Sequence, residues 1–427
     1  MPLPTASSEA SAPAEYSSGF ETPDEHFAAA ACSYRSVRVH AQQAQGLPGQ
    51  YLAAYSARTH KLYVSSIFNF TPAHGSTVAT IARVDPQTLA IEATAQLPVI
   101  DEAHPNLIGE YQLCGAFGLS VDDTRGTIWV TDPTTSSVAV YDRDTFAPIW
   151  SSYQPDVSLE QQPVNHPREV LVLEDIGKAV VTGPGGYWFI DTGTYAITAH
   201  NPVPGSLPHT LTITRDTLGG NIYLSDYNLD KVYEVSPAIG EAVRTINVPA
   251  GETSDFSRVN THGVAINNSL NEIYVSTQGE NGKNSGVQVL DKISGSFKQF
   301  IPYGITPTDI IADETRDLVY LTDFGPTSVH PADSGGGTVA VIDARTKSVV
   351  AEVHIASGKA NHLTLLPGGM VIALDKAGTH KNVEVGFHID PVTGKHVNSA
   401  IDVHASGTTP INADSITKIT VALNNAG

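Results

Sequence analysis

The chain has 427 residues, enough for two or three ordinary domains, but closed all-β folds of this size also form single units. Its formal net charge of -20 disfavours binding to nucleic acid or to anionic lipid, because phosphate groups attract clusters of Lys and Arg. Although 41% of the residues are hydrophobic, no run approaches the roughly 20 apolar residues that a membrane-spanning helix needs. We therefore predict no membrane span.

Residues 1–28 are rich in Ala, Ser, Pro and Glu and show no hydrophobic periodicity. Such a composition buries too little apolar surface to fold, so we predict a disordered leader followed by a single domain over residues 29–427. Polar stretches of this kind often follow a cleaved signal peptide. We expect an exported protein, extracellular, on the cell surface or periplasmic, whose signal peptide is not present in this sequence. Cys32 and Cys114 fit either one disulfide or two reduced buried thiols.

A tetrapeptide of β-branched, aromatic and small polar residues recurs along the chain. Its composition is typical of a β-strand. Seven copies occur: Tyr63–Ser66, Trp129–Asp132, Val180–Gly183, Tyr223–Asp226, Tyr274–Thr277, Tyr320–Asp323 and Ile372–Asp375. The spacing between copies, roughly 43 to 66 residues, is in the range of propeller repeats.

A second motif, Asp-x-x-Thr/Ser, ends an alternating strand downstream of six of the seven copies. Its copies are Asp85–Thr88, Asp142–Thr145, Asp191–Thr194, Asp291–Ser294, Asp343–Thr346 and Asp390–Thr393, and the fourth repeat has Ser236-Pro237 instead. Asp and Thr at this spacing bond their own backbone in a tight turn. Each repeat thus predicts a four-stranded antiparallel blade, and the whole chain an all-β, seven-bladed β-propeller. Helical solenoids are excluded, because apolar residues alternate.

Ring closure requires that a strand from one terminus complete the blade begun at the other. Two terminal segments alternate well, residues 34–40 (YRSVRVH) and 415–423 (SITKITVAL). We expect both to meet in the last blade.

The combination of Tyr-Val-Ser/Thr-x with Val-x-Val-Ile-Asp-x-x-Thr resembles the repeat of the YVTN/NHL-type propellers, over about residues 50–400. The resemblance implies the propeller fold. It leaves the function open, since such propellers include cell-surface proteins, lactonases, lyases and binding proteins.

Alignment of the residues just before the first strand of each blade brings three histidines to one position: His209, His262 and His362. His166 is shifted from it by two residues. In a propeller this position lines one face of the central channel, and three imidazoles with one open position suit Zn²⁺, Cu²⁺ or Fe²⁺. The alternative is that each imidazole bonds the backbone of a neighbouring blade and the channel holds water.

Resemblance to metal-dependent propeller enzymes of similar repeat type implies roles for further residues. Arg168 would neutralise a developing oxyanion, Tyr51 or His166 would move a proton, and Asp309 would orient a ligand histidine. The alternatives are a salt bridge between Arg168 and Glu169, and a lining role for the Tyr51 ring.

Three long segments, 69–76, 278–286 and 324–337, are expected to wall the channel mouth. Phosphate-loop and haem-attachment motifs are absent from the sequence, and nothing in it indicates a nucleotide, haem or flavin. We expect an exported, YVTN-like monomer with a histidine-lined channel and a small-molecule or glycan ligand, acting as a metal-dependent lyase or hydrolase. The alternative is a non-catalytic propeller, secreted or on the cell surface, that binds a protein, glycan or metal.

Overall fold

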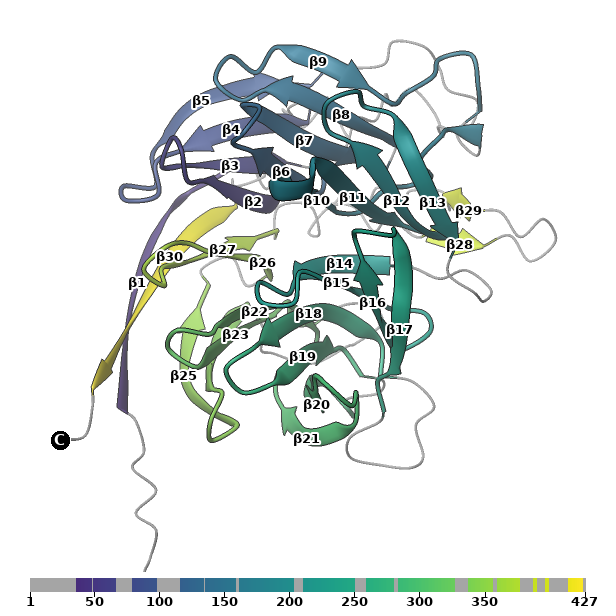
Figure 1. The fold of residues 1–427 in the computed structure, drawn as a ribbon. Coiled ribbons are helices and arrows are strands. Elements are labelled where there is room, and N and C mark those ends of the chain that lie inside the picture. The colour runs from purple at the N-terminus through teal and green to yellow at the C-terminus, as the bar shows by residue number, and fades with distance from the viewer. Residues whose placement is uncertain are drawn as a thin grey trace, which may run out of the picture.

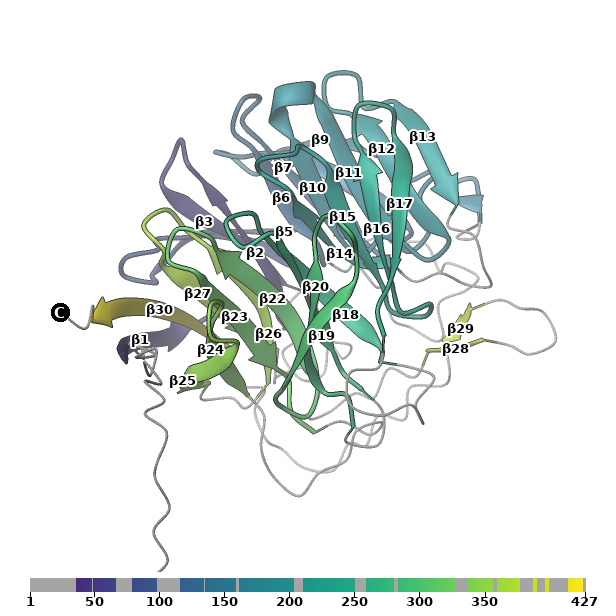
Figure 2. The ribbon, with the colours of Figure 1, turned by 60° about the horizontal axis from the view of Figure 1, so that its bottom comes forward.

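A computed structural model shows seven four-stranded antiparallel sheets arranged in a ring (Figure 1), which confirms the predicted seven-bladed β-propeller. The structure describes residues 36–47, 49–66, 79–97, 116–133, 135–158, 161–202, 210–249, 259–279, 283–326, 337–355, 359–376, 387–389, 396–398 and 414–424. The predicted leader, Cys32, Cys114 and His209 lie outside these residues. The second view, in Figure 2, shows the blades following one another around the ring in chain order.

The first three blades take up the N-terminal half of the chain. Blade 1 comprises β2 (Gln50–Ser56), β3 (Lys61–Ser66), β4 (Thr80–Val84) and β5 (Ile91–Gln96). Blade 2 comprises β6 (Leu119–Asp122), β7 (Thr127–Asp132), β8 (Ser137–Asp142) and β9 (Pro148–Ser151). Blade 3 comprises β10 (Val170–Leu173), β11 (Lys178–Gly183), β12 (Gly186–Asp191) and β13 (Ile197–Pro202), with the short 3-10 helix η3 (Glu174–Ile176) after β10.

The other four blades complete the ring. Blade 4 comprises β14 (Thr210–Arg215), β15 (Ile222–Asp226), β16 (Lys231–Ser236) and β17 (Glu241–Asn247), and blade 5 comprises β18 (Thr261–Asn267), β19 (Glu272–Thr277), β20 (Gly286–Asp291) and β21 (Phe297–Pro302). Blade 6 comprises β22 (Pro307–Asp313), β23 (Leu318–Asp323), β24 (Thr338–Asp343) and β25 (Ser348–His354). Blade 7 comprises β26 (Ala360–Leu365), β27 (Val371–Asp375), β30 (Ser415–Asn424) and β1 (Ser36–Gln45).

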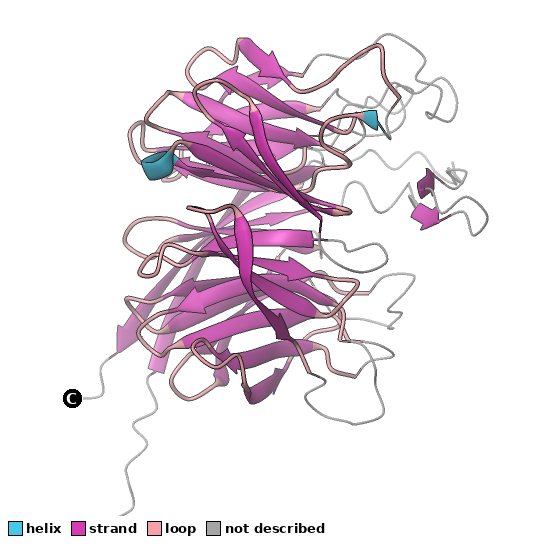
Figure 3. Ribbon diagram, turned by 45° about the vertical axis from the view of Figure 1, so that its right-hand side comes forward, coloured by secondary structure: helices cyan, strands magenta, loops and turns pink. Residues whose placement is uncertain are grey.

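Strands account for nearly all regular structure in the described part of the chain (Figure 3). The seven tetrapeptides lie in β-strands, as predicted. They end the second strand of each blade, and their residues are buried because both faces of each blade pack on neighbours. Five of the largest fully buried side chains belong to them: Tyr63, Trp129, Tyr223, Tyr274 and Tyr320. No helix among the described residues is long and apolar enough to cross a membrane.

The Asp-x-x-Thr motif forms the turn between the third and fourth strands. In blade 2, Oδ1 of Asp142 accepts hydrogen bonds from Thr145 N (2.8 Å) and from Thr145 Oγ1 (2.7 Å), and Phe146 follows at φ 61°. The motif aspartates of blades 1, 3, 5 and 6 accept equivalent backbone bonds: Asp85, Asp191, Asp291 and Asp343. The turn prediction is confirmed for these five blades.

Blade 7 departs from the expected order. The strand that runs into Asp390 was expected to follow the tetrapeptide strand of this blade, but the C-terminal β30 pairs with β27 in that place. The strand upstream of Asp390, β28 (Phe387–Ile389), pairs instead with β29 (His396–Asn398) in a separate two-stranded sheet. The residues 390–393 themselves lie outside the described part of the chain.

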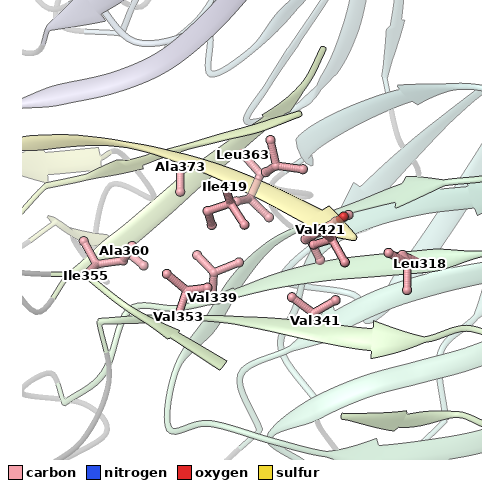
Figure 4. Packing of buried hydrophobic residues seen from close by; sticks show 12 residues of the cluster. Leu318, Val339, Val341, Val353, Ile355, Ala360, Leu363, Ala373, Ile419 and Val421 are labelled. Atoms are coloured by element: carbon pink, nitrogen blue, oxygen red, sulfur yellow. The ribbon is translucent and has the colours of Figure 1, made fainter. Parts of the chain in front are cut away.

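Both termini complete blade 7, as predicted, with the strand order β1-β30-β27-β26. β1 and β30 pair over ten residues in continuous register, from Ser36 opposite Asn424 to Gln45 opposite Ser415. Figure 4 shows how Ile419 and Val421 of β30 pack with residues of blade 6 in one buried cluster. The apolar core of this interface therefore includes a strand from the C-terminus.

A hydroxyl group in the second strand ties one blade to the next. In blade 2, Thr131 Oγ1 accepts a hydrogen bond from Gly118 N (2.8 Å) and donates one to the carbonyl of Arg168 in blade 3 (2.9 Å). The same two bonds recur at Ser65, Ser225, Ser276 and Thr322. Blade 7 has Leu374 at this position. The Ser or Thr of the repeat thus fixes the backbone at the entrance of the following blade.

Candidate functional site

The first strands of the blades form the inner wall of the ring, because each contacts the first strand of the next blade around the full circle. Seven side chains on or just before these strands, together with Lys376 directly after β27, make up what we call the axial cluster. Its members are Tyr51, Phe117, Arg168, Glu169, His262, Asp309, His362 and Lys376.

Close backbone packing brings the entrance residues together. A Cβ atom on Gly118 would lie 2.6 Å from the carbonyl oxygen of Arg168, so only glycine allows blades 2 and 3 to approach this closely. The carbonyl of Arg168 also accepts a hydrogen bond from Gly118 N at 3.0 Å. Arg168 is therefore held at the inner edge of blade 3.

An unbroken series of side-chain contacts runs through the axial cluster. The guanidinium carbon of Arg168 lies 5.5 Å from the ring centroid of Phe117, and the rings of Phe117 and Tyr51 are 4.6 Å apart. The Tyr51 ring lies 4.6 Å from the imidazole of His362, whose Nδ1 is 3.4 Å from Oδ2 of Asp309. These residues come from blades 3, 2, 1, 7 and 6 in turn, so the contacts follow the ring.

Two cations lie over the two aromatic rings. Nζ of Lys376 is 4.9 Å from the centroid of Tyr51, next to the Phe117 ring that Arg168 covers. The pKa of Lys376 is lowered to about 8, first by desolvation and then by the positive charge of Arg168, with Asp414 opposing the shift. Desolvation also lowers the pKa of Arg168, against a hydrogen bond with Tyr51.

Tyr51 is a proton donor rather than a base at neutral pH. Desolvation raises the pKa of its phenol to about 12, although the charge of Arg168 lowers it. The neutral phenol and the guanidinium can therefore both donate hydrogen bonds to an acceptor placed at the ring axis.

Asp309 is anchored by the backbone of two blades. Its Oδ1 accepts a hydrogen bond from Ile310 N (2.9 Å) and its Oδ2 accepts one from Leu363 N (2.8 Å) in blade 7. The same Oδ2 faces Nδ1 of His362 at 3.4 Å. Asp309 and His362 are only 8% and 2% exposed. This geometry orients the imidazole with Nδ1 toward the carboxylate and Nε2 away from it.

The pKa values of His262 and Glu169 are both shifted toward the neutral form of the side chain. Burial, followed by the charge of His362, lowers the pKa of His262 to about 3. Its Nδ1 is buried and makes no hydrogen bond of good geometry within the described part of the chain, although the Thr308 backbone is near the ring. Burial, followed by the charge of Asp309, raises the pKa of Glu169 well above its usual range, against a hydrogen bond from the backbone of blade 4.

Two of the three histidines expected at one position, His262 and His362, stand at different positions along their strands. His262 follows Thr261, which pairs with the last residue of its tetrapeptide, Thr277. His362 comes one residue later in the equivalent register of β26, in which Ala360 pairs with Asp375. For His262 and His362 the expectation of matched register is wrong, because aligning the histidines on one another ignored their distance from the tetrapeptide.

This difference in register bears on the predicted metal site. Among the residues that the structure describes, no group of three or more His, Cys, Asp or Glu side chains has the geometry to hold a metal ion. His362 and Asp309 are both close enough to His262 to influence it electrostatically, and Asp309 contacts His362. His209, the third predicted ligand, lies outside the described residues, so the metal site stays a prediction.

The remaining predicted residues lie near the cluster. His166 precedes Arg168 by two residues, is half-buried with φ 40°, and donates its backbone N–H to Ser136 Oγ at 3.2 Å. Phe324 begins the predicted wall segment 324–337, and its ring centroid lies 5.8 Å from Nζ of Lys376. Arg168, for which a salt bridge to Glu169 was the alternative, forms a hydrogen bond with Tyr51.

Sequence reasoning did not select Phe117, Glu169 or Lys376 as site residues. Phe117 occupies the aligned entrance position of blade 2 but was given no role, and Glu169 directly follows the aligned residue Arg168. Lys376 directly follows the last tetrapeptide, where its side chain lies at the inner end of the second strand. Only the closed ring brings it onto Tyr51.

No family model matches the chain, and a search of curated proteins finds no match either. The YVTN/NHL resemblance therefore depends on the repeat residues alone.

Proposed function

We propose that the protein is an exported, YVTN-like propeller that binds a small organic anion at the ring axis. The observation that carries this proposal is the placement of two desolvated cations, Arg168 and Lys376, over the touching rings of Phe117 and Tyr51. Export is supported by the polar leader, and YVTN membership by the repeat motifs.

A bound anion would relieve the repulsion between the two cations. The charge of Arg168 lowers the pKa of Lys376, which means that both positive charges act on the same region. A carboxylate there accepts hydrogen bonds from the guanidinium and from the Tyr51 phenol, and its attraction to Lys376 is strengthened by the low local dielectric. The aromatic rings supply an apolar surface for the rest of the ligand.

Calorimetric titration with acetate, succinate and benzoate at pH 7 tests the proposal. We expect binding of at least one of these anions, loss of most of the affinity in Lys376→Gln, and retention in Lys376→Arg. Lys418→Gln, on β30 of the same blade and outside the axial cluster, serves as the control and should bind like the wild type. If the wild-type protein binds none of the three anions at millimolar concentration, the proposal fails.

A metal-dependent lyase or hydrolase is the second candidate, favoured by the neutral imidazole of His262 with its buried Nδ1. His262 and His362 offer two nitrogen donors, and Asp309 supplies the carboxylate that orients a ligand histidine. Because these residues alone do not form a three-ligand group, the site needs His209 or a residue of the substrate. Zn²⁺, Cu²⁺ or Fe²⁺ would act as a Lewis acid there.

In this second candidate, Arg168 neutralises oxyanion charge and Tyr51 donates a proton to the leaving group. Elemental analysis of protein produced in metal-supplemented medium tests it, together with His209→Ala, His262→Ala and His362→Ala. A stoichiometric metal content in the wild-type protein that is lower in each variant supports this candidate function. Wild-type protein without bound metal rejects it.

A further inference from the structure

Asp309 is a buried carboxylate without a cationic partner from Lys or Arg among the described residues. Its oxygens accept hydrogen bonds from Ile310 N and Leu363 N, and the ionisable side chain that contacts it among the described residues is His362, at 3.4 Å. Buried carboxylates are normally balanced by a full positive charge, since desolvating an anion costs several kcal/mol. Two backbone N–H groups and one imidazole do not supply a full positive charge, so we expect a cation of the ligand to supply it.

A second, independent feature is a buried histidine nitrogen close to this carboxylate. Nδ1 of His262 in blade 5 is buried and makes no hydrogen bond of good geometry within the described part of the chain, although the Thr308 backbone lies near the ring. Buried ring nitrogens of histidine nearly always have a partner, and an exception needs an explanation such as a bound ligand. Asp309 in blade 6 acts electrostatically on His262, so the two groups face one region.

The axial cluster therefore has two poles. Arg168 and Lys376 lie against the rings contributed by blades 1 and 2, whereas the Asp309 carboxylate and the His262 nitrogen are contributed by blades 5 and 6. The His362 imidazole, between Tyr51 and Asp309, connects the two poles. A ligand that spans the axis meets cations at one end and hydrogen-bond acceptors with a negative charge at the other.

We propose that the ligand is zwitterionic, with an anionic group held at Arg168, Lys376 and Tyr51 and an ammonium group held between Asp309 and His262. This inference rests on the proposed anion-binding function and names the ligand class for it. An ammonium group carries three N–H donors on one compact charge, which suits a carboxylate oxygen and an imidazole nitrogen together. A divalent metal suits the described residues less well, because they form no three-ligand group.

A series of ω-amino carboxylates, from glycine to 6-aminohexanoate, measures the span between the poles on the wild-type protein. Each compound is compared by calorimetry with the alkanoate of the same length, which lacks the amine, and with the alkylamine, which lacks the carboxylate. We expect one length of amino carboxylate to bind at least about tenfold more tightly than both matched compounds. Equal affinity for the amino carboxylate and the alkanoate at every length overturns the zwitterion proposal.

The variant Asp309→Asn separates this proposal from the anion site. We expect it to lose the tenfold preference and to keep the affinity for the alkanoate, because Arg168 and Lys376 are intact. Asp175→Asn removes a carboxylate from the outside of blade 3, where Asp175 pairs with Arg215, and should keep the preference. If the alkanoates do not bind to wild-type protein at all, the proposed anion site fails first.

Asn keeps an acceptor oxygen for one of the two backbone N–H groups that hold Asp309, and thermal unfolding shows whether the variant is folded. If it is not, the length series on wild-type protein still decides the question. The variant His262→Phe supplies a second check, since it removes the ring nitrogens and preserves an aromatic ring. This variant should bind the amino carboxylate more weakly and bind the alkanoate with unchanged affinity.

Discussion

Nζ of Lys376 lies 4.9 Å from the ring centroid of Tyr51, although 325 positions separate the two residues in the sequence and they belong to the last and first blades. The contact crosses the seam at which the ring closes. Any ligand bound by both residues therefore bridges that seam, so closure and binding are coupled.

Anion binding should weaken as the pH rises through about 8. The pKa of Lys376 is lowered to about 8 in the folded protein, so its positive charge is lost above that pH. A bound anion favours the charged form, and binding near pH 8 is therefore expected to take up protons. Calorimetry in two buffers of different ionisation enthalpy measures this uptake. Lys376→Arg should bind with little change up to pH 9.

The same lysine should make the folded protein less stable at neutral pH than at pH 9 to 10. Because the pKa is lower in the folded state than its ordinary value of 10.5, the unfolded chain binds more protons between about pH 8 and 10.5. The free energy of unfolding therefore rises with pH in this window, as far as Lys376 is concerned. Lys376→Met should remove this contribution, which denaturant titrations at pH 7 and pH 9.5 detect as a difference between variant and wild type.

Glu169→Gln should stabilise the protein at neutral and alkaline pH. The pKa of Glu169 is raised in the folded state, so above the usual pKa of 4.5 the folded protein binds more protons than the unfolded chain. Stability contributed by this group falls as the pH rises from 4.5 toward the raised pKa. Glutamine does not ionise. The variant should therefore not show this loss of stability when thermal unfolding is measured at pH 8. An unchanged pH profile in the variant would contradict the assignment.

Ser276→Ala should destabilise the protein by about 1 to 3 kcal/mol, because the buried Gly263 N–H and Thr308 carbonyl lose a hydrogen-bond partner. Ser294→Ala, in the exposed turn of the same blade, removes a hydroxyl that water can replace and should change the stability by less than about 1 kcal/mol. Urea unfolding of both variants makes the comparison. Equal losses would show that the hydroxyl bridge does not link the blades energetically.

Gln288→Leu should stabilise the protein. The side chain is fully buried in blade 5, and neither its Nε2 nor its Oε1 has a hydrogen-bond partner among the described residues. Removing two unsatisfied polar atoms is expected to gain roughly 1 to 2 kcal/mol. Gln162 is the matched control: it is also buried, but its amide bonds the backbone of Gln154, so Gln162→Leu should be destabilising. Thermal unfolding decides between gain and loss.

The fold was largely predictable because its strongest signals are local. Tetrapeptides such as Tyr274–Thr277 are apolar on both faces, as second strands packed between two neighbours must be, and Asp142 with Thr145 carries the geometry of its own turn. Ring closure was predictable from alternation at the two termini. The third strand of blade 7 was misplaced because residues 387–389 alternate as well as the other third strands, and the sequence does not show that β30 pairs with β27 instead.

The site was predictable only in outline. Tyr51, Arg168, His262, Asp309 and His362 were selected from their place at the blade entrances, and the structure brings them together at the ring axis. The position of each residue along its strand was not predictable. In most of the inner strands a β-bulge follows the first residue pair and shifts the register locally.

The ribbon of β1 and β30 also determines how the ring responds to mechanical force. Because Ser36 pairs with Asn424, the two strands leave the ring side by side at the same end (Figure 1). Tension applied to these ends loads the ten residue pairs one after another, starting at Ser36, instead of shearing all of them at once. The propeller should consequently peel open from its seam at low force, before any other blade is disturbed.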